Sequence, residues 1–216
     1  MPRHFIISVY LKLALILFFG CLYVNASANE NGLQFVTLSA SKQLDSGHTL
    51  IGVIGDIHEE FAGEIAYLGL AKKMDSGLVW KAGYFGYFPE QDDGHYIEDH
   101  RLRGSLSYTF KLNSWRLMHR SRVEYRMGQL SSGFRYRPTL NLSRPITIGE
   151  TTLIPYAEVE PFYDFKQHQL TLTIFTAGIK WPVTPNISLN IGHMNIFLNE
   201  ENTHAKGPLV GLHIKL

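Results

Sequence analysis

Polar and apolar side chains alternate with a period of two along most of the chain from residue 33 onwards, and this pattern restricts the fold more than any other feature. The alternating segments are about 10–14 residues long, which is typical of β-strands. Turn-forming residues separate several of them, as at Asp45-Ser46-Gly47, Asp75-Ser76-Gly77 and Asn113-Ser114. We count eleven expected strands, at residues 33–43, 48–60, 64–74, 78–88, 100–111, 115–127, 134–144, 152–165, 169–182, 187–198 and 208–216.

Alternation alone does not tell which face of the sheet is buried, because soluble and membrane barrels are reversed in this respect. The expected strands are about twice the usual length of about 5–6 residues and match the roughly 9–11 residues that cross a bilayer at a tilt. Short turns alternate along the chain with longer polar loops, as in outer-membrane barrels. Aromatic residues lie near strand ends, as interfacial girdles require; they are Tyr84, Phe85, Tyr87, Phe88, Phe110, Trp115, Phe134, Tyr136, Tyr163, Phe165 and Trp181.

These features predict an all-β fold, an antiparallel transmembrane up-and-down β-barrel of roughly 10–12 strands in the outer membrane. The chain ends within its last strand, where Val210, Leu212 and Ile214 are the apolar positions. Single-chain bacterial barrels have even strand numbers, so we expect ten or twelve strands in place of the eleven counted. A soluble periplasmic β-barrel that binds an apolar ligand remains an alternative.

Residues 1–28 have the composition of a secretory signal peptide, with the basic residue Arg3, an apolar run at 13–24 and a small residue at Ala28. We therefore expect a single barrel domain at residues 29–216, exported through the periplasm to the outer membrane of a Gram-negative bacterium. The expected partners are outer-membrane lipid and the barrel-assembly machinery.

Two further features of the whole chain bear on its class. Cys21 is the single cysteine, and its acylation would make the protein a lipoprotein instead. The net charge of +1 provides no global basic field, so a nucleic-acid partner is not expected.

The segment 119–126 (His-Arg-Ser-Arg-Val-Glu-Tyr-Arg), followed by Phe-Arg-Tyr-Arg-Pro at 134–138, resembles an uncharacterised outer-membrane barrel family called domain of unknown function 2490. A later strand with Ile-Pro-Tyr-Ala-Glu at 154–158 and a closing pair at 187–192 and 211–216 are similar to that family as well. The resemblance covers most of residues 30–216. It implies a fold and a location, and because the family has no agreed activity it carries over no catalytic residues.

One face of the middle strands is rich in arginine, and the following strand carries carboxylates. Arginine pairs carboxylates through a planar fork of five donors, so these side chains could fill a narrow barrel as a hydrogen-bonded plug. Alternatively, they line an anion-conducting lumen or a site for small anionic solutes. The candidate lumen-lining residues are Arg101, Arg103, Arg116, Arg120, Arg122, Glu124, Arg126, Arg135, Arg137, Glu158, Glu160 and Asp164.

Other constellations give weaker indications of chemistry. His119 and Ser121 lie two apart on the apolar face of their strand, so an outer-membrane lipid hydrolase is an alternative function, although no acidic residue shares that face. The acidic segment 90–100 lacks the ligand spacing of a calcium loop. Histidine and cysteine spacing predicts no zinc site, and no glycine-rich phosphate loop is present. We therefore expect no metal or other cofactor, and favour a structural or conducting barrel over an enzyme.

Overall fold

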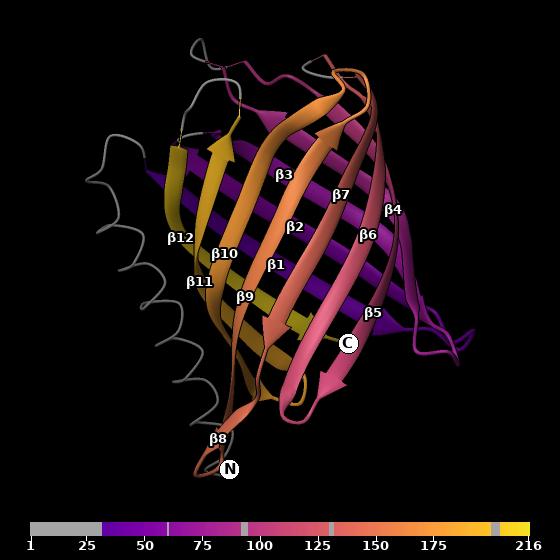
Figure 1. Ribbon diagram of the computed structural model, residues 1–216, viewed down its shortest axis with the longest axis vertical. Coiled ribbons are helices and arrows are strands. Elements are labelled where there is room, and N and C mark those ends of the chain that lie inside the picture. Colours follow the sequence, from indigo (N-terminus) through magenta and orange to yellow (C-terminus); the bar gives the residue numbers. More distant parts are fainter. Residues whose placement is uncertain (1–31, 60, 92–94, 130–131, 200–203) are drawn as a thin grey trace, which may run out of the picture.

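The computed structural model describes residues 32–59, 61–91, 95–129, 132–199 and 204–216, and β-strands account for nearly all of them (Figure 1). The predicted signal peptide lies outside the described residues. The strands are β1 (Leu33–Gln43), β2 (Thr49–Glu59), β3 (Gly63–Lys73), β4 (Val79–Pro89), β5 (Asp99–Leu112), β6 (Trp115–Met127), β7 (Ser132–Ser143), β8 (Ile146–Ile148), β9 (Thr151–Asp164), β10 (Gln169–Thr184), β11 (Ile187–Leu198) and β12 (His204–Lys215). In this part of the chain no helix is long and apolar enough to cross a membrane.

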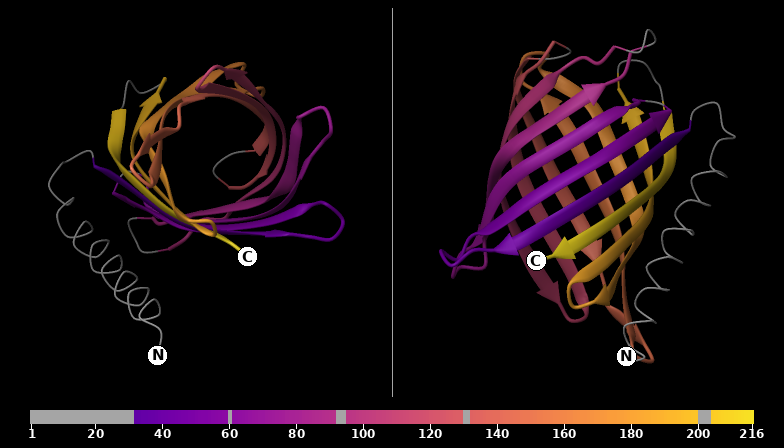
Figure 2. Two further views of the ribbon diagram at one scale, coloured as in Figure 1. Left: turned by 90° about the horizontal axis from the view of Figure 1, so that it is seen from below. Right: turned by 180° about the vertical axis from the view of Figure 1, so that it is seen from behind.

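Eleven strands form the wall of a closed barrel, which confirms the expected β-barrel. Neighbouring strands pair in the order β1 to β7, then β9 to β12, and β12 pairs with β1 to close the ring (Figure 2). The short strand β8 is outside this ring and forms a hairpin with the first residues of β9.

The expectation of an even strand number was wrong, while the count of eleven segments was correct. All neighbouring wall strands are antiparallel except β1 and β12, which run parallel, with Phe35 opposite Leu209 and Ser41 opposite Lys215. With an odd number of strands that alternate in direction, the first and last strands must point the same way. The parallel pair therefore makes closure possible at eleven strands.

His213 on β12 lies across this parallel seam from two serines of β1. Its Nδ1 atom is 2.9 Å from Oγ of Ser39 and its Nε2 atom is 3.0 Å from Oγ of Ser41. The Ser39 hydroxyl also lies 3.2 Å from the carbonyl oxygen of Leu212, to which it donates a hydrogen bond. Side-chain hydrogen bonds thus supplement the backbone ladder where the barrel closes.

The short turns have the local chemistry that tight hairpins need. Gly47 and Gly77 occupy the same place in two Asp-Ser-Gly turns, with φ angles of 76° and 84°. Only glycine adopts such angles without steric cost. Asn113, with φ of 55°, makes the two-residue turn between β5 and β6. These turns all lie at one end of the barrel, and the strand ends at Glu59, Pro89 and Leu198 lie at the other.

The alternating pattern places charged, aromatic and some aliphatic residues inside the barrel and a broad apolar band outside. Exposed outward-facing side chains surround the wall; they include Ile54, Leu68, Leu102, Leu106, Phe110, Val123, Leu140, Leu142, Phe175 and Ile191. Monomeric soluble proteins rarely expose a continuous apolar surface of this extent.

Aromatic residues mark both ends of the outer band, with one correction to the sequence analysis. Trp80, Trp115 and Trp181 face outward near the short turns, while Tyr125, Phe134, Tyr163, Phe165 and Phe197 face outward near the opposite end. Phe85 and Tyr87 do not belong to a girdle, because they line the interior cavity. Both faces of β4 are rich in aromatic residues, so its sequence pattern did not reveal which face turns inward.

Candidate functional site: a charged belt and an interior cavity

The register of four neighbouring strands brings arginines opposite carboxylates inside the barrel. Arg103 on β5 lies directly opposite Glu124 on β6, which lies opposite Arg135 on β7, which in turn lies opposite Asp164 on β9. Opposite charges in directly facing positions stabilise a sheet. We use the name charged belt for seven interior side chains that contact one another: Arg103, Arg120, Glu124, Arg135, Arg137, Thr139 and Glu160.

Glu124 lies at the centre of the belt and has no exposed surface, with a relative accessibility of 0%. Arg135 donates two hydrogen bonds to its Oε2 atom, of 3.1 and 2.8 Å. Arg137 donates one of 2.7 Å to Oε1, and Nε of Arg103 lies 2.6 Å from the same oxygen. Three guanidinium groups therefore compensate one buried carboxylate, as a buried charge requires.

Glu160 is the second acidic member of the belt, and Arg137 joins it to Glu124. Nη2 of Arg137 donates a hydrogen bond of 2.9 Å to Oε2 of Glu160. Arg120 and the Thr139 hydroxyl donate to its other oxygen, at 3.1 and 3.0 Å. Arg122 lies further away, with Nη1 at 3.5 Å from that oxygen and no hydrogen bond to it. Each belt carboxylate thus binds more than one cation.

Two phenylalanines pack against the guanidinium groups of the belt. Arg103 lies 3.3 Å from the ring centroid of Phe85, and Arg137 lies 3.8 Å from that of Phe162. Arginine stacks on aromatic faces while its edge remains free to donate hydrogen bonds. The rings therefore hold the planar groups in the orientation that the carboxylates use.

The remaining candidate residues lie outside the belt. Arg101 pairs with Asp99, its Nε atom 3.1 Å from Oδ2, and Arg126 pairs with Asp164 near the same end of the barrel. Glu158 accepts a hydrogen bond of 3.0 Å from Asn141. Arg116 is exposed near the short turns and contacts none of these carboxylates in the described residues. The structure thus divides the sequence-selected set into a belt, two separate ion pairs, Glu158, Arg122 and an isolated Arg116.

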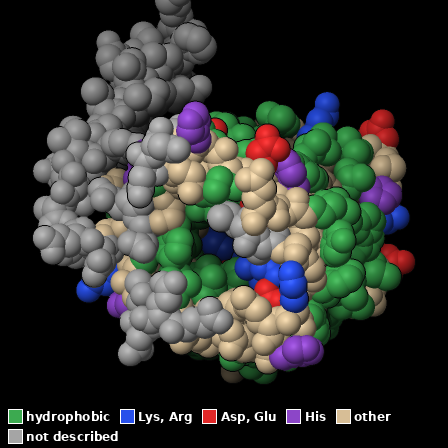
Figure 3. Space-filling model, turned by 90° about the horizontal axis from the view of Figure 1, so that it is seen from above, with side chains coloured by type: hydrophobic (Ala, Val, Ile, Leu, Met, Phe, Trp, Pro, Cys, Tyr) green, Lys and Arg blue, Asp and Glu red, His purple; other side chains and the backbone are tan. Residues whose placement is uncertain are grey.

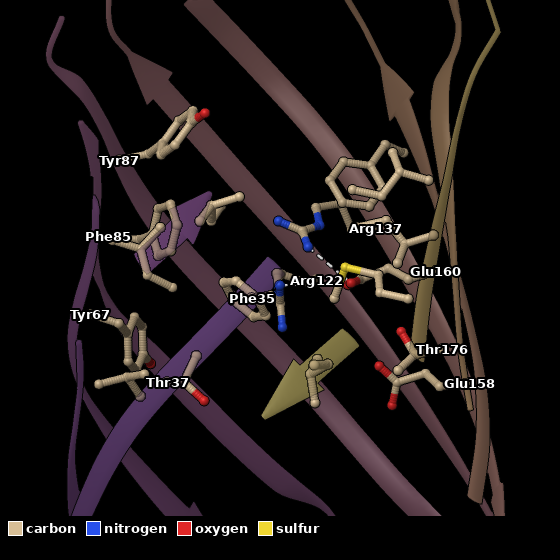
Figure 4. Close-up of a pocket in the computed structure, with 18 of the residues that line it drawn as sticks. Phe35, Thr37, Tyr67, Phe85, Tyr87, Arg122, Arg137, Glu158, Glu160 and Thr176 are labelled. Carbon is tan, nitrogen blue, oxygen red and sulfur yellow. Dashed lines mark hydrogen bonds and ion pairs between the residues drawn. The ribbon is translucent and has the colours of Figure 1, made fainter. Parts of the chain in front are cut away.

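Beside the belt the barrel encloses a cavity of about 570 Å³. Apart from Lys81, its lining is mostly apolar on the side of β1 to β4, and it is charged on the side of β5 to β9. Figure 4 shows Tyr67 and Phe85 across the cavity from Glu158 and Glu160. Seen from the end at the top of Figure 1, a hollow leads inward with Lys or Arg side chains at its rim and floor (Figure 3). The cavity is of the size that accepts small molecules.

Two cationic residues of this cavity were missed by the sequence analysis. Lys81 on β4 and Lys180 on β10 line it together with Arg120 and Arg122. The charges of Arg120, Arg122 and Lys180 all act on the ammonium group of Lys81. Lys81 pairs in register with Ser105, which pairs with Arg122, so all three lie on the inner face. The long connection between β4 and β5 hides this register from the sequence.

The two weaker constellations are placed as follows. Nε2 of His119 lies 3.1 Å from Oγ of Ser121, which also lies 3.0 Å from the Tyr136 hydroxyl. No carboxylate of a described residue is bonded to His119, so the orienting group of a catalytic triad is missing there. Asp92 and Asp93 of the acidic segment lie outside the described residues, and among those described no group of three or more His, Cys, Asp or Glu could hold a metal ion.

Comparison with known proteins identifies a family. No curated protein matches the chain. A family model described as "Protein of unknown function (DUF2490)" matches residues 56–206, which extend from β2 to β12 and include every residue of the charged belt. The match covers more than two thirds of the chain, so this protein belongs to the DUF2490 family.

Proposed function

We propose that this protein is an outer-membrane β-barrel whose charged belt holds one side of the wall together and leaves a cationic chamber beside it. The observation that supports the membrane location best is the inversion of the barrel: charged side chains gather inside while large apolar side chains cover the outside. Lipid would cover that outer band, and closure of the ring leaves no unpaired sheet edge within the membrane.

The belt supports a structural role over a conducting one. An anion-selective pore needs cations that face water and remain free to attract ions. Here Arg135 and Arg137 are buried and hydrogen-bonded to carboxylates. Barrels with few strands fill much of their interior with side chains, and eleven strands lie closer to this class than to the 16–18 of porins.

Membrane fractionation combined with gel electrophoresis tests the proposal. We expect the protein to require detergent for extraction and to migrate differently before and after boiling, because a folded membrane barrel resists the denaturant of the gel. Recovery in the soluble periplasmic fraction without detergent would favour the soluble ligand-binding barrel instead and would overturn the membrane location.

A further inference from the structure

We propose that the interior cavity binds an amphipathic anion, a molecule with one acidic headgroup and an apolar chain. This inference rests on the proposed function, since it assigns a ligand to the chamber beside the belt. It depends on three properties of the cavity: the cations that carboxylates do not neutralise, the apolar part of its lining, and the position of these cations relative to that apolar part.

The cations that line the cavity outnumber its carboxylates. They are Lys81, Arg101, Arg103, Arg120, Arg122, Arg137 and Lys180, against Glu158 and Glu160. Both carboxylates are already engaged, Glu158 by Asn141 and Glu160 by Arg120, Thr139 and Arg137. Asp99 and Glu124, which do not line the cavity, balance Arg101 and Arg103. The five remaining cations still outnumber the two carboxylates, so the cavity has a net positive charge.

Lys81, Lys180 and Arg122 are the cavity cations with the least compensation by carboxylates, and among the described residues Lys180 contacts only the ring of Tyr156, at 4.8 Å. Nη1 of Arg122 comes no closer than 3.5 Å to Glu160, and within the described part of the chain Lys81 has neither an ion pair nor a hydrogen bond. Arg122 and Lys81 repel each other, because only β5 separates their strands and both side chains line the same cavity. An acidic headgroup between them would replace repulsion by charge-assisted hydrogen bonds.

Away from these cations most of the lining is apolar. Apart from Lys81 on β4, Lys180 on β10 and a few neutral polar residues, the side chains from β1 to β4, β10 and β11 are aliphatic and aromatic, among them Phe35, Val53, Ile65, Tyr67, Ile174 and Met194. In Figure 4, Phe35 and Tyr67 lie across from Arg137 and Glu160, with Arg122 between the two sides. A small inorganic anion would leave this surface in contact with water, whereas an apolar chain would cover it.

The ligand probes for the test are undecanoate and decyl phosphate, which share the same decyl tail and carry the two candidate acidic groups. Decyltrimethylammonium has the same tail with reversed charge, and inorganic phosphate is a headgroup alone. Binding of each is measured by equilibrium dialysis against the purified full-length barrel in one nonionic detergent, after boiling-dependent gel mobility has shown that the protein is folded.

We expect at least one of the two acidic probes to bind about tenfold or more tightly than either decyltrimethylammonium or inorganic phosphate, and the stronger of the two identifies the headgroup. The double variant Lys81→Gln with Arg122→Gln should bind that probe about 10–100-fold more weakly, since charge-assisted hydrogen bonds are lost. Lys111→Gln, which removes an exposed cation from the inward face of β5 outside the cavity, is the matched control and should bind as the wild type does.

Three results would overturn the assignment: equal binding of the acidic and the cationic amphiphile, binding of inorganic phosphate as strong as that of decyl phosphate, or unchanged binding by the double variant. A folded, detergent-extracted barrel that binds neither acidic probe would refute this ligand and leave the membrane location intact. Binding by protein recovered without detergent would instead support the ligand and refute the location.

Discussion

Nη1 of Arg137 donates a hydrogen bond of 2.7 Å to Oε1 of Glu124, a carboxylate that no solvent reaches. The other terminal nitrogen of the same guanidinium group binds Glu160, at 2.9 Å. One side chain of β7 therefore connects a carboxylate on β6 with one on β9 across two strand boundaries. The belt acts as a set of side-chain bonds between strands in addition to the backbone ladder.

Glu124→Gln should destabilise the barrel strongly. The substitution leaves Arg103, Arg135 and Arg137 buried without their shared anion, and loss of one partner from a buried ion pair costs about 3–5 kcal/mol. The measurement is the temperature at which the folded gel mobility is lost. Glu158→Gln is the matched control, because Glu158 accepts its hydrogen bond from the neutral Asn141, and it should shift that temperature much less. Equal shifts would mean that the belt does not hold the wall.

Leu106→Arg should impair assembly of the barrel. Leu106 is 53% exposed on the outer face near the middle of β5. In the proposed membrane location an arginine there would contact the hydrocarbon core, at a cost of about 2–4 kcal/mol. Ser107→Arg is the control at the adjacent, inward-facing position, and it should reduce assembly less. The two variants are compared by the yield of folded barrel in the membrane. Similar yields would contradict the assignment of faces.

Thr139→Arg is not a suitable control for that comparison, although its strand alternation places it inward. Thr139 has no exposed surface and its hydroxyl both donates to Glu160 and accepts from Arg120. An arginine there would overfill the belt, so we expect this inward change to be severe as well.

A cysteine pair across the seam should form a disulfide. Val36 lies directly opposite Val210 on the parallel strand, a spacing within the range that a disulfide bridges. Val36→Cys with Val210→Cys, in a Cys21→Ala background, should therefore cross-link on mild oxidation, as detected by mobility on a non-reducing gel. Val36→Cys with Ile214→Cys places the second thiol about 13 Å further along β12 and should remain reduced. The reverse pattern would rule out the eleven-stranded closure.

The wild-type barrel should show no steady anion current in a planar bilayer, because the belt arginines are hydrogen-bonded to carboxylates and do not face a water-filled path. Arg120→Gln with Arg122→Gln should lower the heat resistance of the folded form, since Arg120 bonds both Thr139 and Glu160. A wild-type anion current that this double substitution weakens, with heat resistance unchanged, would support a pore and contradict the structural role of the belt.

Much of the fold follows from period-two alternation and turn chemistry. The two-residue turn at Asn113-Ser114 sets Leu112 opposite Trp115, and this register alone places Arg103 opposite Glu124. The partners of Glu124 on β7 could not be derived in the same way, because the connection between β6 and β7 has no such defined turn. The position of Arg135 and Arg137 relative to Glu124 depends on the register between β6 and β7.

The sequence also did not predict the strand number, the inward face of β4 or the cavity, and each omission has a physical cause. The rule that single-chain barrels have an even number of strands led to the wrong expectation of ten or twelve strands. That rule assumes that the first and last strands pair antiparallel, and nothing in the sequence of β1 or β12 reveals their parallel pairing. The inward direction of Phe85 and Tyr87 was hidden because both faces of β4 carry several aromatic residues. The cavity itself arises from eleven strands acting together and has no local signature.

Quenching of tryptophan fluorescence by brominated lipids tests the membrane account most directly. All three tryptophans of the chain, Trp80, Trp115 and Trp181, face outward near the short-turn end of the barrel, where an interfacial girdle would lie. In reconstituted vesicles we predict strong quenching by bromine placed near the headgroup end of the acyl chain and weaker quenching by bromine near its methyl end. Absence of quenching by either lipid would show that the tryptophans do not contact the bilayer and would contradict the outer-membrane barrel.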